Sequence, residues 1–276
     1  MPELPLVTIV TPSYNQDKYL EETINSVLKQ TYPNIEYFII DGGSSDNSVE
    51  IIKKYEDKLA WWVSEPDKGQ SDALIKGFAR AKGKYLAWLC SDDVLEPSMI
   101  KISVNFLEKY PGAVLTYGNR TRIDSIGNTI CFSKHYVNNK LFRFGPGLPQ
   151  ETVVFRKEHY YQVGGINPDL QMVMDYDLWC KFYKVGYFLY IPAYLGRFRS
   201  HQSNKSTLFS TEMEHNGFEG KFTNEFRDVY KQHFDKPFSM IIRKITLLIN
   251  SFIRLLLSQT SDYKMKKKEI KQLQNS

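Results

Sequence analysis

Cysteine is scarce in this 276-residue sequence, and long apolar runs are missing altogether. The three cysteines, Cys90, Cys131 and Cys180, are widely spaced and form no CxxC pair, so we expect neither a disulfide framework nor a zinc cage. No stretch reaches the roughly 18 uncharged apolar residues that a membrane-spanning helix needs. The first residues also lack the basic and apolar regions of a signal peptide. These absences predict a cytoplasmic chain.

Glycine motifs of the common nucleotide-binding folds are missing as well. GxGxxG does not follow the first apolar run, and neither GxxxxGKS/T nor GxSxG occurs in the sequence. Dinucleotide-dependent oxidoreductases and P-loop enzymes are therefore disfavoured. What is present is an ordinary globular composition, with 42% hydrophobic and 24% charged residues, and enough chain for one large domain with an appendage.

Positive charge is concentrated at the C-terminal end. Residues 231–276 contain ten Lys or Arg against three acidic residues, a net charge of +7. Because the whole chain carries +5, the first 230 residues carry −2. The near-neutral body offers no basic groove and the tail lacks interleaved aromatics, so we expect no nucleic-acid partner.

Short β-branched runs alternate with helically periodic segments over the first 110 residues. Each predicted strand precedes a predicted helix, and the strands are 6–10, 37–40, 60–63 and 85–89. Four such units predict an α/β fold with a mostly parallel central sheet flanked by helices. Within this pattern, Asn47 and Glu50 have the spacing of a capping box, and Pro97 is expected at the first position of a helix.

The rhythm changes after residue 110. The later predicted elements are strands at 114–117, 129–132 and 187–191, a loop at 138–149 and a helix at 175–185. Residues 211–276 are expected to form a basic, amphipathic helical tail, because apolar residues are dense in 238–257 and lysines follow. The charges within 238–257 disfavour spanning a bilayer but suit a helix lying at its surface. A helix packed on the body or on another subunit is the alternative.

Polar residues follow three of the predicted strands, where parallel sheets bind ligands. The first strand ends in Thr11, Pro12, Tyr14 and Asn15, the second in Asp41, and the fourth in Asp92 and Asp93. An aromatic ring and one Asp suit a nucleobase, whereas adjacent carboxylates suit Mg²⁺ or Mn²⁺ holding a diphosphate. Taken singly, Asp41 could instead form a turn, and the Asp92–Asp93 pair could cap a helix.

Two stretches of the sequence resemble family 2 glycosyltransferases of the GT-A fold. They are VTIVTPSYNQDKYLEETINSVLKQTYPNIEYFIIDGGSSDNSVEIIKKY and SEPDKGQSDALIKGFARAKGKYLAWLCSDDVL, and the resemblance extends over about 5–205. It is nearest to the bacterial O-antigen and capsule polysaccharide branch. The resemblance implies a GT-A domain at 1–210, with a nucleotide-binding half at 1–110 and an acceptor half at 111–210.

The same resemblance implies roles for individual residues on the donor side. Donor-binding residues would be Thr11, Pro12, Tyr14, Asn15, Asp41, Asp67, Lys68, Asp72, Lys76, Ser91 and Asp92. The family's metal-binding DxD maps to Cys90-Ser91-Asp92, so Cys90 stands where the first Asp is often found. Asp92 is then the first choice as a metal ligand and Asp93 the second, because a thiol is a poor partner for Mg²⁺.

The acceptor side resembles the family at Met174-Asp175-Tyr176-Asp177. Asp175 holds the position of the catalytic base, and Asp177 is the second candidate. In a helix the two point about 160° apart, so only one faces the cleft. The resemblance also makes His201 a metal ligand and Arg197, Arg199 and Lys205 partners of the donor phosphates.

We therefore expect an inverting, metal-assisted glycosyltransferase that uses Mn²⁺ or Mg²⁺ and an Asp general base. Its donor would be a nucleoside diphosphate sugar, most simply a UDP-sugar, and its acceptor a lipid-linked surface glycan. Contact with the membrane through residues 236–276 would place the protein peripherally on the inner face of the cytoplasmic membrane. The alternatives are a sugar nucleotidyltransferase and a non-catalytic sugar-nucleotide-binding subunit of a membrane assembly.

Overall fold

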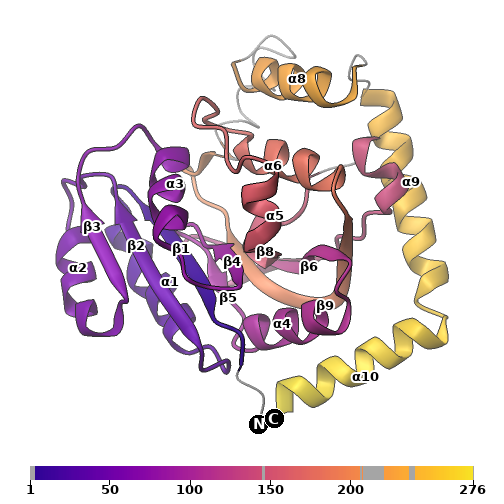
Figure 1. Ribbon diagram of the computed structural model, residues 1–276, viewed down its shortest axis with the longest axis horizontal. Helices are drawn as coiled ribbons and strands as arrows, with labels where there is room; N and C mark the ends of the chain where they lie inside the picture. Colours follow the sequence, from indigo (N-terminus) through magenta and orange to yellow (C-terminus); the bar gives the residue numbers. More distant parts are fainter. Residues whose placement is uncertain (1–3, 145–146, 206, 208–220, 236–239, 276) are drawn as a thin grey trace.

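The computed structural model describes residues 4–144, 147–205, 207, 221–235 and 240–275 (Figure 1). Its centre is a nine-stranded sheet in the order β3-β2-β1-β4-β8-β6-β9-β5, with β7 paired to β6. The predicted α/β class is confirmed. The predicted boundary between residues 210 and 211 lies outside the described residues.

The first four strands form a parallel half-sheet, as predicted. They are β1 (Val7–Ser13), β2 (Ile35–Asp41), β3 (Trp61–Ser64) and β4 (Tyr85–Trp88). Their register places Ser13 beside Asp41 and Asp41 beside Ser64, so the carboxyl ends of β1, β2 and β3 are level. A level edge brings the polar residues after these strands to one side of the sheet.

The second half of the sheet is mixed. Its strands are β5 (Val94–Leu95), β6 (Ala113–Ile123), β7 (Thr129–Ser133), β8 (Val154–Arg156) and β9 (Tyr187–Arg199). β8 pairs antiparallel with both β4 and β6, whereas β6 and β9 pair in parallel. β9 is far longer than the predicted strand at 187–191. Near its end, Gly196 and Arg197 pair with β5, which directly follows Asp92 and Asp93.

Helices cover both faces of the sheet because successive strand residues point to opposite sides. The helices of the body are α1 (Asp17–Leu28), α2 (Ser48–Lys54), α3 (Gln70–Arg80), α4 (Met99–Lys109), α5 (Lys157–Gln162) and α6 (Met174–Tyr183). Val10 and Trp88 pack in one apolar cluster with α3 and α6. Ile9 and Ala87 pack in the other with α1, α2 and α4. Short 3₁₀ turns lie at Glu56–Lys58, Asn139–Phe144 and Gln150–Thr152.

Three local predictions need correction. Asn47 precedes α2 but makes no side-chain cap; Asp46 accepts the Ser48 N–H instead, at 2.9 Å. Pro97 lies two residues before α4 rather than at its first position, and its carbonyl accepts the Thr31 N–H. The predicted loop at 138–149 contains a 3₁₀ turn. Local spacing could not reveal these outcomes, because neighbouring segments supply the competing partners.

The described residues after the body, 221–235 and 240–275, contain three helices, as predicted for the tail. They are α8 (Lys221–Phe234), α9 (Met240–Leu257) and α10 (Ser261–Asn275). Figure 1 shows α8 beside α6 and α9 along one side of the body. From there α10 runs towards the N-terminus of the chain. Glu269 ties α10 to α4 through Asn105 and Lys109, each at 2.7 Å. Among the helices described, none combines the length and the apolar character needed to cross a bilayer.

Candidate active site

The loops after β1 and β2 are bound to each other at the level edge of the sheet. Asn15 adopts a left-handed backbone, with φ of 51°, and its Oδ1 accepts the Ser45 N–H at 2.9 Å. In return, Ser44 Oγ accepts the Asn15 N–H at 2.8 Å. Tyr14, between the strand and this link, is 62% exposed. A free aromatic face beside two fixed loops can stack on a planar ring.

Asp41 and Thr11, two of the expected donor-binding residues, are both buried. Asp41 is fully buried, and its oxygens accept from the backbone of Gly43 and Ser44 and from the hydroxyl groups of Ser44 and Ser64. Its carboxylate thus shapes the loop after β2. Thr11 is also fully buried and shares a hydrogen bond with the Tyr37 hydroxyl, while Pro12 lies beside Ile40 in the sheet. These residues therefore support the edge of the sheet from within.

The segment from Asp67 to Lys76 lies next to the loop after β2. Asp67 accepts the Gly69 N–H at 2.7 Å, and a Cβ on Gly42 would lie 2.9 Å from its carboxylate, so glycine is needed there. Burial raises the pKa of Asp67. Asp72 accepts the Lys68 N–H. Lys76 is paired with both Asp72 and Glu65, at 3.3 and 3.0 Å, so its charge is already balanced.

Asp92 and His201 form a pair suited to a divalent cation. His201 Nε2 lies 3.0 Å from Asp92 Oδ2, and the ring is held by Ser203 and by a tilted contact with the Tyr19 ring, 4.7 Å between centroids. Adjacent ligands of an octahedral ion with bonds near 2.1 Å are about 3 Å apart, so this spacing fits both residues as ligands of Mn²⁺ or Mg²⁺. The Ser91 carbonyl and the Asp93 carbonyl both accept from Thr23, which fixes the turn that carries Asp92.

Asp93 and Cys90 lie beside this pair but are engaged elsewhere. The ligand atoms of Cys90, Asp92 and Asp93 lie within 4.8 Å of one another. Asp93 is buried and accepts the Arg199 N–H at 2.9 Å. Burial raises the pKa of the Cys90 thiol, whose sulfur lies between Gln70 and Gln150. A protonated thiol is no ligand for a hard ion, so the donor set is best supplied by Asp92 and His201.

The two arginines of the closing segment are committed to protein contacts. Arg199 is 1% exposed; it donates to the Asp92 carbonyl and to Glu22 and lies over the ring of Tyr19. Arg197 pairs with Glu96 at 2.7 Å. Both arginines were expected to bind the donor phosphates. In this structure Arg199 instead stabilises the turn that carries Asp92, and Arg197 links β9 to Glu96, directly after β5.

The structure separates the two carboxylates at the start of α6. Asp177 is 1% exposed and ion-paired with His233 and Lys181, each at 2.7 Å, so it is a structural group and not a second candidate base. Asp175 is half-buried and accepts the Tyr176 N–H. Desolvation raises the pKa of Asp175 to about 6, against the opposing effects of that hydrogen bond and of the Arg120 charge. A carboxylate with such a pKa can accept a proton near neutral pH.

Lys205 is the expected phosphate partner that stays close to the other groups. Its ammonium donates to Gln70 Oε1 and to the Gln171 carbonyl, at 3.1 and 3.0 Å. Gln70 in turn donates to Cys90 Sγ at 3.2 Å, so Lys205 links the turn after β4 to the turn before α6. One donor of its three remains for a ligand beyond these two contacts.

Arg120 and Gln70 were not expected at this site, whereas Gln150 and Glu151 belong to a loop, 150–152, that resembles the family and was expected to touch the acceptor. Arg120 binds Glu151 with two hydrogen bonds of 2.7 and 2.6 Å, and Glu151 is 1% exposed. Gln70 and Gln150 flank Cys90. The pairing partners are far apart in the chain and their residue types are common, so no spacing in the sequence signals them.

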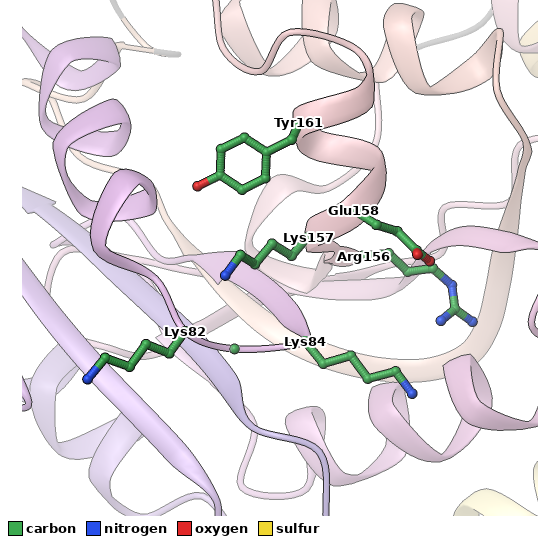
Figure 2. Close-up of a pocket in the computed structure, with 7 residues that line it drawn as sticks. Lys82, Lys84, Arg156, Lys157, Glu158 and Tyr161 are labelled. Atoms are coloured by element: carbon green, nitrogen blue, oxygen red, sulfur yellow. The ribbon is translucent and has the colours of Figure 1, made fainter.

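A separate hollow of about 340 Å³ lies at the other end of β4 (Figure 2). Lys82, Lys84, Arg156 and Lys157 line it, with Glu158 and Tyr161. Lys84 is paired with Glu108, Lys157 donates to the Ala81 carbonyl, and Arg156 is buried on backbone carbonyls. Figure 2 shows Lys82 and Lys84 directed to opposite sides, so their charges do not converge on one point.

Sequence comparisons agree with these features. A profile of the family described as "Glycosyl transferase family 2" matches residues 8–164. An uncharacterized glycosyltransferase of Rickettsia prowazekii is 32% identical over 235 residues, which cover 80% of this chain and 74% of that protein. One from Rickettsia felis is 30% identical over 261 residues, 90% of this chain but only 43% of that relative, so the chain spans less than half of its length. The chondroitin synthase of Escherichia coli is 28% identical over 193 residues, covering 68% of this chain and 28% of the synthase.

Solved structures show the same fold at low identity. Staphylococcus aureus TarS residues 1–349 in complex with UDP-GlcNAc gives a TM-score of 0.61 at 16% identity, covering 84% of this chain and 73% of that one. The mannosyltransferase PcManGT from Pyrobaculum calidifontis, in complex with GDP-Man and Mn²⁺, gives 0.60 at 15% identity, covering 96% and 83%. The predicted fold class is thereby confirmed.

Proposed function

Because this chain belongs to glycosyl transferase family 2, of the GT-A fold, we propose that it transfers a sugar from a nucleoside diphosphate donor to a hydroxyl group of a glycan, with inversion. The observation that carries this proposal is the pairing, in one site, of Asp92 and His201 with a separate carboxylate of raised pKa, Asp175. Through its hydrogen bonds to Gln70, which donates to Cys90, and to the Gln171 carbonyl, Lys205 connects the turn after β4 with the turn before α6. One carboxylate suits the leaving diphosphate side and the other the acceptor side.

The proposed reaction needs one proton transfer and one displacement. Asp175 accepts the proton of the acceptor hydroxyl while that oxygen forms a bond to the anomeric carbon from the face opposite the diphosphate. The bond between the anomeric carbon and the phosphate oxygen breaks, and the electron pair leaves with the nucleoside diphosphate. Lys205 donates a hydrogen bond to the leaving group. A divalent ion held by Asp92 and His201 would offset the charge that develops there.

The identities of the donor and the acceptor are proposed from the residues at the edge of the sheet and from the related proteins. We propose a UDP-sugar, since the TarS structure of the same fold is in complex with UDP-GlcNAc. Tyr14 and the Asn15–Ser45 link would receive the nucleoside, and Asp67, Lys68 and Asp72 would border the sugar and phosphates. The acceptor would be a lipid-linked surface glycan of the O-antigen or capsule type. Calorimetric titration with UDP, GDP and dTDP, with and without Mn²⁺, tests the donor; failure of all three would refute it.

The raised pKa of Asp175 predicts a pH dependence. Only the deprotonated carboxylate can act as base, so kcat should fall about tenfold per pH unit below pH 6 and level off above it. Initial rates at saturating donor between pH 4.5 and 8, on enzyme whose folding is checked at each pH, measure this profile. An apparent pKa near 4 would contradict the desolvated base.

We also propose that residues 236–276 bind the inner face of the membrane, of which 236–239 lie outside the described residues. Two polar residues of α9 face the body: Asn250 Oδ1 accepts the Asn138 N–H, and Arg254 donates to the Lys134 carbonyl. Its outward face is apolar and exposed, and consists of Leu248, Ile249, Phe252, Leu255 and Leu256. The adjoining α10 exposes four lysines: Lys264, Lys267, Lys268 and Lys271. An apolar face next to lysines suits an anionic bilayer, with each lysine contributing about 1 kcal/mol.

Replacing Leu248, Phe252 and Leu255 together by serine should weaken binding to anionic vesicles at least about tenfold, because these side chains would leave the acyl boundary. Vesicle co-sedimentation measures the loss. Ile126, Ile130 and Phe132, exposed apolar residues at the turn before β7 and within it, provide the control triple variant. Equal loss in both variants, or none in either, would contradict membrane contact through α9.

Two alternatives from the sequence stay distinguishable. A sugar nucleotidyltransferase would release pyrophosphate, whereas the proposed enzyme releases a nucleoside diphosphate. A non-catalytic subunit would bind the donor without turnover. Product analysis of the donor after incubation with candidate acceptors therefore decides between the three.

A further inference from the structure

α8 is attached to the active site by specific polar contacts as well as by packing. It is separated in the chain from β9 by residues 200–220, of which 206 and 208–220 lie outside the described residues, and it follows the 8–164 segment matched by the family profile. Val229 and Tyr230 are buried in the apolar cluster shared with α6. Phe226 packs against Tyr176 of α6, with ring centroids 4.7 Å apart and the rings tilted by 30°. The helix therefore rests directly on the helix that carries Asp175.

The first polar contact is made by Glu225. Its carboxylate accepts the Gln171 N–H at 2.6 Å and the Met172 N–H at 3.1 Å. Both amides belong to the turn that precedes α6, three to four residues before Asp175. Hydrogen bonds from backbone amides to an ionised carboxylate are about twice as strong as neutral ones, so this turn is held firmly.

The same turn touches the donor side of the site. Gln171 donates to the Lys68 carbonyl at 3.3 Å, and its own carbonyl accepts from Lys205. Gln171 Oε1 would lie 2.7 Å from a Cβ on Gly69, so the two loops are in close approach. Glu225 thus holds, from behind, the turn on which the donor loop, Lys205 and the start of α6 converge.

The second polar contact is made by His233. Its Nε2 lies 2.7 Å from Asp177 Oδ1, two residues after Asp175 in the first turn of α6, and both side chains are almost fully buried. Lys181 takes the other oxygen of Asp177. Two anchors, one before α6 and one in its first turn, fix the rotation of this helix about its axis. That rotation decides where the Asp175 carboxylate points.

We infer that α8 is a positioning element of the transfer reaction, in which Glu225 and His233 hold the turn 170–173 and the first turn of α6 so that Asp175 meets the acceptor hydroxyl. This inference rests on the proposed function. Neither residue touches the reacting atoms. Their contribution is to keep the base in the geometry that an in-line attack needs, where small displacements lower the rate steeply.

Glu225→Ala is the test variant, with Asp228→Ala on the same helix as the matched control, because Asp228 is an exposed carboxylate. Glu225→Ala should lower kcat at least about tenfold and lower the affinity for UDP with Mn²⁺ by a clearly smaller factor, because the same turn also contacts Lys68 and Lys205. Glu225→Gln keeps one acceptor oxygen and should recover part of the rate. Val229→Ala removes packing without touching either anchor and shows what loosening α8 does by itself.

The outcomes separate this inference from the proposed function. An unchanged kcat in Glu225→Ala, or an equal loss in Val229→Ala and Glu225→Ala, overturns the positioning role. A wild-type protein that transfers nothing refutes the proposed function instead. In that case amide hydrogen exchange decides: faster exchange at 171–175 in Glu225→Ala, but not in Asp228→Ala, supports the anchor, and unchanged exchange overturns it.

Discussion

Asp175→Asn should lower kcat by about a thousandfold and leave UDP binding unchanged. A positioned general base contributes typically 10²–10⁴-fold, and the amide cannot accept the proton of the acceptor hydroxyl. A thousandfold corresponds to about 4 kcal/mol of transition-state stabilisation. The change is close to isosteric, and the half-buried side chain keeps an oxygen for the Tyr176 N–H. Transfer rates at saturating donor, together with calorimetric UDP affinity, measure the two effects.

Asp169→Asn is the matched control for this variant, because Asp169 is exposed and lies six residues earlier in the chain. It should retain wild-type kcat. If Asp175→Asn keeps more than a tenth of the activity, the proton is taken by another group and the assignment of Asp175 fails. Loss of UDP affinity in parallel with kcat would also contradict it, since the base is proposed to act on the acceptor side.

Asp92→Ala should abolish the part of UDP binding that depends on Mn²⁺. Asp92 Oδ2 lies 3.0 Å from His201 Nε2, a spacing that fits two ligands of one hard cation. Removing it eliminates one ligand and releases the other, so we expect affinity for UDP in the presence of Mn²⁺ to fall about a hundredfold, to the value measured without metal. His201→Ala should give a smaller decrease, because Asp92 stays in place.

Asp57→Ala, an exposed carboxylate in the 3₁₀ turn after α2, is the control and should leave UDP binding unaltered. The titrations are made with Mn²⁺, with Mg²⁺ and with chelator. If Asp92→Ala binds UDP as the wild type does with Mn²⁺ present, the metal site lies elsewhere. If the wild type binds UDP equally with and without metal, the proposed metal assistance is refuted, whereas the proposed role of Asp175 as the base is not.

Most of the donor half could be predicted from the sequence because its signals are local. Apolar β-branched runs predicted β1 to β4, and the polar residues that end them predicted the edge where Tyr14, Asn15 and Asp92 lie. The roles within that edge were less accessible. Arg199 and Asp177 are charged residues in expected motifs, yet both are 1% exposed and bound to protein groups. A sequence displays the charge of a side chain but not the partners that surround it.

The acceptor side and α8 were beyond prediction for a related reason. Asp177 meets His233 across 56 positions, and Gln171 meets Glu225 across 54. Each contact depends on how one helix lies on another, and a side chain of ordinary type gives no hint of it. The resemblance to the family supplied Asp175, because that residue sits in a motif; it supplied nothing for the residues that hold it.

The pairing of Asp92 with His201 also bears on the order in which the chain folds. These two residues are 109 positions apart, and His201 follows directly on β9, which must first align with β6. Contacts of such long range form late, since the entropy of closing the intervening chain must be overcome first. During synthesis the four parallel strands can assemble while β9 is still being made. Under the proposed function, a nascent chain would form the residues around Tyr14 and Asn15 that receive the nucleoside before it can form the metal site. It could therefore not turn over its donor prematurely.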